Sequence, residues 1–201
     1  MNNCCIVLAA GQGSRFGRKK QFLEIGGIPL WKHVKNKVLS FMDEDDIVVV
    51  GVDIEGGITR SQSVINGLRY LLNKKKDYSK VLILEAARPL VTNEQIEAII
   101  SLDSDSATYA LPVTSTIVLK KGGYIDRNDC LALSTPVVFD FVLFSKAYLT
   151  GKYFDQTDDT IVMYLEYGIQ PFYLEGSENL LKLTYPSDLL ILENLMKKYS
   201  L

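Results

Sequence analysis

Residues 8–21 read LAAGQGSRFGRKKQ and continue directly from a short apolar run, Cys4–Leu8. The run predicts a buried strand. The segment after it, residues 9–17, is rich in glycine, so its backbone can come close to a ligand, and successive N–H groups in such a loop can cradle phosphate. We call residues 9–17 the glycine-rich loop and expect a phosphate-bearing ligand to lie against it.

Buried strands and amphipathic helices alternate along the chain on either side of this pattern. Further strands are expected at residues 47–50, 81–84, 107–113, 170–174 and 181–183. Helices are expected from Pro29 to about Phe41, behind the capping boxes Thr59-x-x-Gln62 and Thr92-x-x-Gln95, at about 139–149, from about 157 and from Pro186. Such alternation predicts an α/β fold, with a mostly parallel sheet that helices cover on both faces. Ligands bind beyond the carboxyl ends of the strands in sheets of this kind.

The alternation of strands and helices is interrupted around Gly122-Gly123. Residues 116–120 and 124–127 flank this pair and predict a small β-hairpin arm over about residues 115–134. No repeat, low-complexity tract or linker divides the sequence, so we expect a single domain over residues 1–201.

The composition excludes several classes of function. The net charge is −2, which does not suit a nucleic-acid binder, and no apolar run is long enough to cross a membrane. Cys4, Cys5 and Cys130 make an odd count without a signal peptide, which favours a reduced, cytoplasmic location. His33 is the single histidine and lies in a predicted helix, so a histidine-based triad or zinc site has little to build on.

Two known phosphate loops do not fit the glycine spacing. The dinucleotide fingerprint needs G-x-G-x-x-G, but Gly17 lies one position late and no acid stands between Trp31 and Lys37. The Walker pattern is absent as well. What remains is A-A-G-x-G-x-R followed by K-Q, which resembles the pyrophosphorylase-type nucleotidyltransferases. Arg15 and Lys20 can neutralise the charge that grows on a nucleoside triphosphate when its α-phosphorus is attacked.

Further motifs along the chain narrow this resemblance. They are E-G-G-x-T-R at 55–60, E-A-A-R-P at 85–89, P-V-x-x-T at 112–116, D-R-N at 126–128 with T-P at 135–136, T-D-D at 157–159, and E-G at 175–176 with K-L-T at 182–184. Nearly end to end, the sequence resembles the methylerythritol-phosphate cytidylyltransferase family, which is related to ribitol-5-phosphate cytidylyltransferases and to the N-terminal domain of the bifunctional isoprenoid-pathway enzymes. The resemblance implies a Rossmann-like nucleotidyltransferase fold. It also implies transfer of CMP from CTP to 2-C-methyl-D-erythritol 4-phosphate, with release of pyrophosphate, in isoprenoid precursor synthesis.

The same resemblance implies residue roles. Nucleotide binding falls on Ala9, Ala10, Gly11, Gly13, Gly57, Arg60, Ser63 and Glu85. For Arg60, a role that only braces its own loop is an equal alternative. Binding of the polyol phosphate falls on Arg88, Thr116, Arg127, Thr135 and Thr157, and catalysis on Arg15, Lys20 and Lys182. Glu85 takes the place of a magnesium-binding Asp, and Mg²⁺ would bridge the triphosphate oxygens. In the family the arm helps to build a homodimer, which makes such a dimer an expectation here.

Departures from the family leave more than one function open. Glu85 replaces Asp, which adds about 1.5 Å of reach. Val137 stands where the family has Gln, and the stretch from Val50 to Gly56 lacks a βα unit. Ribitol 5-phosphate or another cell-surface polyol phosphate is therefore an alternative substrate. A homologue that binds nucleotide or sugar phosphate without turnover is a second possibility, and a nicotinamide-dependent dehydrogenase is a third.

Overall fold

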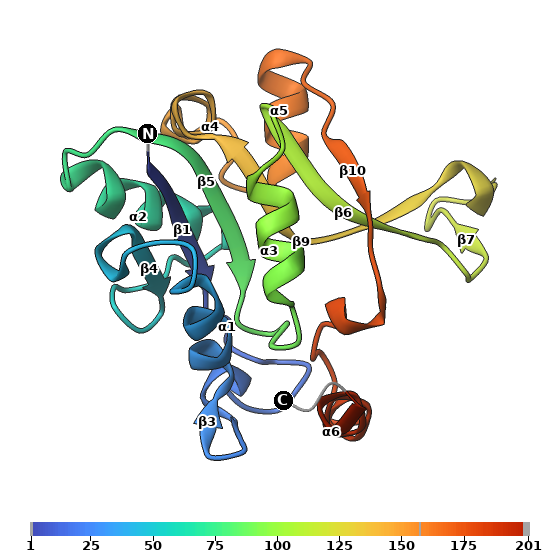
Figure 1. The fold of residues 1–201 in the computed structure, drawn as a ribbon. Helices are drawn as coiled ribbons and strands as arrows, with labels where there is room; N and C mark the ends of the chain where they lie inside the picture. The colour runs from blue at the N-terminus through green and yellow to red at the C-terminus, as the bar shows by residue number, and fades with distance from the viewer. Residues whose placement is uncertain (1, 157, 199–201) are drawn as a thin grey trace.

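A six-stranded sheet lies at the centre of the computed structural model, which describes residues 2–156 and 158–198 (Figure 1). Its strand order is β10-β6-β9-β5-β1-β4. The bounds are Asn2–Leu8 for β1, Ile47–Val50 for β4, Tyr78–Glu85 for β5, Ser106–Pro112 for β6, Leu131–Asp140 for β9 and Phe172–Glu175 for β10. Only β9 runs antiparallel to its neighbours β5 and β6, so the prediction of a mostly parallel mixed sheet is confirmed.

Helices cover both faces of this sheet. One face packs against α1, Leu30–Val38, and α3, Asn93–Ile100. The other face packs against α2, Arg60–Asn73, α4, Phe141–Leu149, and α5, Asp159–Tyr167. Because successive side chains of a strand point to opposite faces, Cys5 and Val7 of β1 join the first apolar cluster and Cys4 and Ile6 join the second.

A third apolar cluster supports the glycine-rich loop from outside the sheet. Leu192 and Met196 of α6, Asp188–Lys198, pack there with Leu30, Leu183 and Phe16 of the loop. Phe16 is only 7% exposed. The last helix therefore anchors the loop through a buried aromatic side chain.

Both predicted capping boxes are present, at the starts of α2 and α3. The antiparallel strand β9, in contrast, was not expected from the sequence. Pro136 lies inside it, and proline argues against a central strand because it cannot donate a ladder hydrogen bond. The strand accommodates Pro136 at an irregularity: Tyr109 pairs with Ser134 and Thr108 with Val137, which leaves residues 135 and 136 without partners in that ladder.

Several expected element bounds differ from the structure, and one expected strand is not formed. The first helix ends at Val38 rather than Phe41. The helix expected from residue 139 begins at Phe141, because the side chain of Asp140 caps it by accepting a hydrogen bond from the N–H of Leu143. Residues 181–183 are not a strand: after the short 3-10 helix Glu178–Leu180 they run as an irregular segment beside β5.

The segment between β4 and α2 is short, as expected. In the described chain it holds a tight turn and one isolated bridge, Val50 with Ile54. Gly51 has a φ of +102°, and a Cβ there would lie 2.7 Å from the backbone of Ala9 and Ala10. The turn therefore packs directly against the glycine-rich loop.

A small hairpin projects from the sheet beyond β6 and β9, as expected (Figure 1). Its strands are β7, Ile117–Val118, and β8, Tyr124–Ile125. The helices of residues 2–156 and 158–198 are all too short or too polar to span a membrane.

Candidate active site

A pocket of about 550 Å³, which we call the main pocket because the glycine-rich loop lines it, lies at the carboxyl ends of β1 and β5. Five segments line it: the glycine-rich loop, the short 3-10 helix Lys20–Phe22, the start of α2 with the residues before it, the end of β5 and the irregular segment near residue 183. Its lining includes all eight residues to which the family resemblance assigned the nucleotide, namely Ala9, Ala10, Gly11, Gly13, Gly57, Arg60, Ser63 and Glu85. The loops after Leu8 and Leu84 thus meet at one site, as the sheet topology requires.

The glycine-rich loop turns sharply at Gly13, which has a φ of +70°. A Cβ at this position would lie 1.8 Å from the carbonyl oxygen of Arg18, so the turn requires glycine. The Gly13 carbonyl oxygen accepts hydrogen bonds from the N–H groups of Phe16 and Gly17 at 2.9 Å. Gly11, in contrast, has open space where a Cβ would stand.

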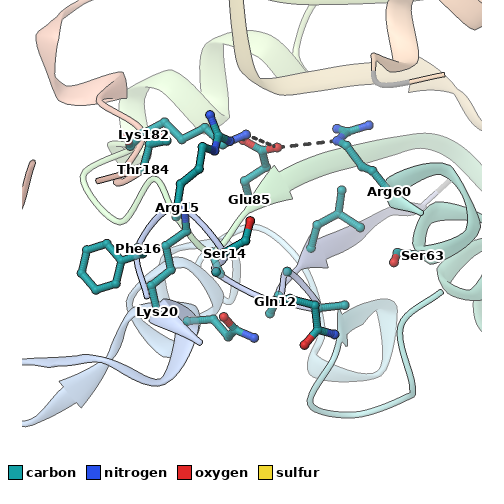
Figure 2. A pocket seen from close by; sticks show the side chains of 18 of the residues that line it. Gln12, Ser14, Arg15, Phe16, Lys20, Arg60, Ser63, Glu85, Lys182 and Thr184 are labelled. Carbon is teal, nitrogen blue, oxygen red and sulfur yellow. Dashed lines mark hydrogen bonds and ion pairs between the residues drawn. The ribbon is translucent and has the colours of Figure 1, made fainter. Parts of the chain in front are cut away.

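Arg15 and Lys20 stand at the wall of this pocket, near the irregular segment that leads into α6 (Figure 2). The guanidinium carbon of Arg15 lies 5.8 Å from the centre of the Tyr185 ring. The Lys20 ammonium donates a hydrogen bond to the Leu183 carbonyl oxygen. Burial lowers the pKa of Lys20, and the charges of Lys182 and Arg15 lower it further. A bound polyphosphate would relieve this repulsion, because it brings negative charge among the three cations.

Glu85, the last residue of β5, sits between cations on the pocket floor (Figure 2). The Lys182 Nζ lies 2.9 Å from each carboxylate oxygen. The Nε of Arg60 lies 3.6 Å from Oε1, and the Nε of Arg88 lies 3.4 Å from Oε2. Burial alone would raise the pKa of Glu85, but these three cations lower it to about 2. Glu85 is therefore ionised and acts as the central anion of the site.

A second, smaller pocket of about 110 Å³ lies on the other side of this cluster. Arg60, Glu85 and Lys182 line both pockets and form the wall between them. Arg88 and Thr135, two of the predicted contacts for the second substrate, line the smaller pocket. The hydroxyl of Thr135 is buried and has no hydrogen-bond partner among the described residues, so it is available to a ligand.

Arg60 lines the main pocket, and its direct contacts are with carboxylates of the protein. Its Nη1 and Nη2 lie 2.6 and 2.7 Å from the two carboxylate oxygens of Asp159, at the start of α5. Asp159 is 1% exposed, and the Tyr148 hydroxyl donates a third hydrogen bond to it. Burial lowers the pKa of Arg60, but Asp159 and Glu85 outweigh this effect and raise it.

Two predicted substrate contacts lie away from both pockets. Thr116 and Arg127 belong to the arm, and Arg127 donates a hydrogen bond to the Thr114 carbonyl oxygen at 2.7 Å. Neither residue lines the pocket of its own chain. Thr157, a third predicted contact, lies outside the described residues. Val137, which stands where the family has Gln, is 4% exposed and lines the smaller pocket.

Several lining residues had no role that the sequence alone could assign. Gln12, Ser14 and Thr184 line the main pocket, and Asp159 lines the smaller one. Asp159 stood within a recognised motif without an assigned function. Its position in the first turn of a predicted helix, next to a second aspartate, was the only available signal.

Glu85 is the one acidic side chain among the residues that line the main pocket. No group of three or more histidine, cysteine or acidic side chains that could hold a metal occurs within residues 2–156 and 158–198. Magnesium commonly takes one or two carboxylates and completes its shell with water and substrate phosphates. The donor set therefore fits a magnesium ion that arrives with a triphosphate, and it does not fit a metal held by the protein alone.

Comparisons with known proteins agree with this geometry. The family described as 2-C-methyl-D-erythritol 4-phosphate cytidylyltransferase matches residues 3–198. A protein of that name from Thermotoga neapolitana is 31% identical over 223 residues, which cover 98% of this chain and 98% of the relative. A bifunctional enzyme, IspD/IspF of Nitratiruptor, is 32% identical over 96% of this chain but only 54% of its own length.

Solved structures show the same fold. The bifunctional IspDF of Campylobacter jejuni superposes with a TM-score of 0.80 at 30% identity, over 94% of this chain and 54% of that one. The 2-C-methyl-D-erythritol 4-phosphate cytidylyltransferase of Thermus thermophilus superposes with a TM-score of 0.76 at 24% identity, over 98% of this chain and all of its own. The chain thus spans about half of the bifunctional relatives and nearly all of the monofunctional ones.

Proposed function

The chain belongs to the 2-C-methyl-D-erythritol 4-phosphate cytidylyltransferase family, and from this premise we propose that it transfers CMP from CTP to 2-C-methyl-D-erythritol 4-phosphate. The reaction releases pyrophosphate and serves isoprenoid precursor synthesis. The observation that supports it best is the wall of Arg60, Glu85 and Lys182 between two adjoining pockets. One pocket has the size and the loop for a nucleoside triphosphate, and the other offers Arg88 and an unpartnered hydroxyl to a phosphomonoester.

CTP occupies the main pocket in this proposal, with its triphosphate along the glycine-rich loop. A phosphate oxygen of the polyol phosphate attacks the α-phosphorus from the smaller pocket, and the bond from the α-phosphorus to pyrophosphate breaks. Lys182 can offset charge on either side because it lines both pockets. Arg15 and Lys20 stabilise the charge that grows on the α-phosphate and on the leaving group. No covalent enzyme intermediate is required.

Magnesium is part of this proposal, with Glu85 as its one protein ligand. When bound, the ion would offset the charge of the triphosphate and orient its oxygens. Glu85 is ionised and thus in the state that a metal ligand needs. A direct ligand bond requires the Lys182 ammonium to turn from Glu85 toward the incoming phosphates.

We infer a homodimer through the arm for two reasons. Exposed apolar side chains gather on it: Val118 is 57% exposed, Tyr124 82% and Leu131 51%. Arg127, a predicted contact of the polyol phosphate, does not reach the pocket of its own chain. An arm that crosses to a second copy would bury the apolar residues and bring Arg127 to that copy's substrate. A cytoplasmic location is also proposed, since all three cysteines are free thiols.

The test is a substrate comparison. The protein is incubated with CTP, Mg²⁺ and either 2-C-methyl-D-erythritol 4-phosphate or ribitol 5-phosphate, and pyrophosphate release is measured. We expect turnover with the first substrate and a kcat/KM about 5- to 150-fold lower with the second, since one missing or misplaced polar group costs about 1–3 kcal/mol. A higher kcat/KM with ribitol 5-phosphate would instead identify the chain as a ribitol-5-phosphate cytidylyltransferase. If pyrophosphate is released with neither substrate, the chain is a homologue that binds nucleotide without turnover.

A further inference from the structure

The first turn of α2 makes an unusual set of contacts with the chain around the start of α5. The hydroxyl of Thr59 donates a hydrogen bond to the Phe154 carbonyl oxygen at 2.8 Å, and the hydroxyl of Ser61 donates one to the Gln156 carbonyl oxygen. Arg60, between them, pairs with Asp159. Three consecutive residues therefore bind a segment that lies nearly 100 positions away in the sequence.

Every nitrogen of the Arg60 guanidinium faces a carboxylate. Nη1 and Nη2 form the two-pronged pair with Asp159, and Nε lies 3.6 Å from Glu85. Asp159 is buried and holds Arg60 in one plane, because a guanidinium and a carboxylate match as two parallel hydrogen bonds. Two of its five N–H groups thus bond Asp159 and its Nε points toward Glu85, so the guanidinium is held by carboxylates of the protein itself.

The Arg60–Asp159 ion pair lies at the smaller pocket, which is assigned to the second substrate. Asp158, Asp159 and Thr160, at the start of α5, line the smaller pocket together with Glu85 and Lys182. Charges alternate along the row from Asp159 through Arg60 and Glu85 to Lys182. Arg60 is the one cation in this row that ties the start of α5 to the anion on the pocket floor.

We propose that Arg60 is a positioning residue for the polyol phosphate and not a nucleotide contact. It fixes the start of α5 and the carboxylate of Glu85 relative to each other, and thereby sets the shape of the smaller pocket. The inference rests on the proposed function, because it assigns that pocket to the second substrate. The nucleotide pocket keeps its shape without the guanidinium, since the Thr59–Gln62 capping box and the hydrogen bond from the Gly57 N–H to Ser63 Oγ hold its wall independently.

Arg60→Lys is the decisive variant, because lysine keeps the charge but cannot form the two-pronged pair and lacks Nε. We expect the kcat/KM for the polyol phosphate to fall by about 10-fold or more, while the KM for CTP stays within about 2-fold. The Kd for CTP, measured by calorimetry without the second substrate, should also stay within about 2-fold of wild type. Arg69→Lys, an exposed position on the same helix, is the matched control and should change neither constant.

A rise of about 10-fold or more in the Kd for CTP would overturn the proposal, since it would make Arg60 a nucleotide contact. Unchanged kinetics for both substrates would overturn it as well. Ser61→Ala removes one hydrogen bond of the same turn and should lower the kcat/KM for the polyol phosphate by a smaller factor. Should Arg60→Lys not fold, this variant decides: an effect on CTP alone, or on neither substrate, contradicts the inference. Wild-type protein without pyrophosphate release would overturn the proposed function instead.

Discussion

The Nζ of Lys182 lies 2.9 Å from both carboxylate oxygens of Glu85. The two residues are 97 positions apart in the sequence, and they join the irregular segment after residue 180 to the end of β5. The family pattern has Asp at the position of Glu85, so the longer side chain reaches further toward the cations of the site. The pair stands in the wall between the two pockets, where nucleotide and polyol phosphate have to meet.

Glu85→Gln tests the role of this carboxylate as central anion. The pKa of Glu85 is lowered from 4.5 to about 2, so its contribution to stability is fully present above pH 4.5 and is lost as the pH falls toward 2. This contribution amounts to at most about 3 kcal/mol at pH 7. The difference in unfolding free energy between wild type and Glu85→Gln should therefore shrink between pH 4.5 and 2 in urea titrations. The exposed control Glu97→Gln should show no such change, and a constant difference for Glu85→Gln would refute the assignment.

Lys182→Met tests charge stabilisation at the boundary between the pockets. We expect kcat to fall by about 10²–10³, the usual cost of one lost donor to a developing anion. Steady-state pyrophosphate release with both substrates saturating measures this effect. Lys32→Met, at an exposed position of α1, should retain full activity. A decrease below about 10-fold for Lys182→Met would mean that Lys182 only pairs with Glu85 and does not act on the reacting phosphates.

Gly11→Ala and Gly13→Ala separate ligand approach from backbone strain in the glycine-rich loop. Gly13 has positive φ and no space for a Cβ, so its variant should lower the Tm by several degrees, about 4 °C or more. Gly11 has open space beside it, so Gly11→Ala should leave the Tm unchanged and raise the KM for CTP, because the new methyl group stands where the triphosphate approaches. Thermal melts measure the Tm of both variants, and steady-state rates at varied CTP concentration measure the KM for CTP. An unchanged KM for CTP in Gly11→Ala would place the triphosphate elsewhere.

Subunit complementation tests the arm. Arg127→Ala and Lys182→Met should each be nearly inactive as homodimers. If Arg127 serves the partner's pocket, a refolded mixture contains heterodimers in which one site has both residues intact. About half of the molecules in an equal mixture are heterodimers, each with one working site, so we expect roughly a quarter of wild-type activity. No recovery in a mixture shown to form heterodimers would mean that each arm serves its own chain.

Local chemistry made much of the fold predictable. The capping boxes Thr59–Gln62 and Thr92–Gln95, the first strand and the glycine-rich loop depend on residues a few positions apart, so the sequence carries their signals directly. The strand β9 escaped prediction because its pairing is non-local and its proline contradicts the local pattern. The start of α4 was displaced for the same reason, since β9 occupies residues 139 and 140.

The residues of the site could be predicted from the sequence, but the contacts between them could not. The resemblance assigned Glu85 to the nucleotide and metal, Arg88 to the polyol phosphate and Lys182 to catalysis, and the structure brings all three together. It could not show that Arg60 pairs with Asp159, because that contact depends on how α2 and α5 pack, 99 positions apart. Nor could it show that Arg127 stands outside the pocket of its own chain.

The most direct test of the central claim follows the oxygen atoms. Polyol phosphate labelled with ¹⁸O in its phosphate is incubated with CTP, Mg²⁺ and the protein, and the products are analysed by ³¹P NMR and mass spectrometry. The proposed attack on the α-phosphorus predicts that all label stays in a cytidine diphosphate polyol, with one ¹⁸O in the bridge between its two phosphorus atoms, and that pyrophosphate is unlabelled. Label in the pyrophosphate, or CTP bound without any diphosphate product, would contradict cytidylyl transfer at this site.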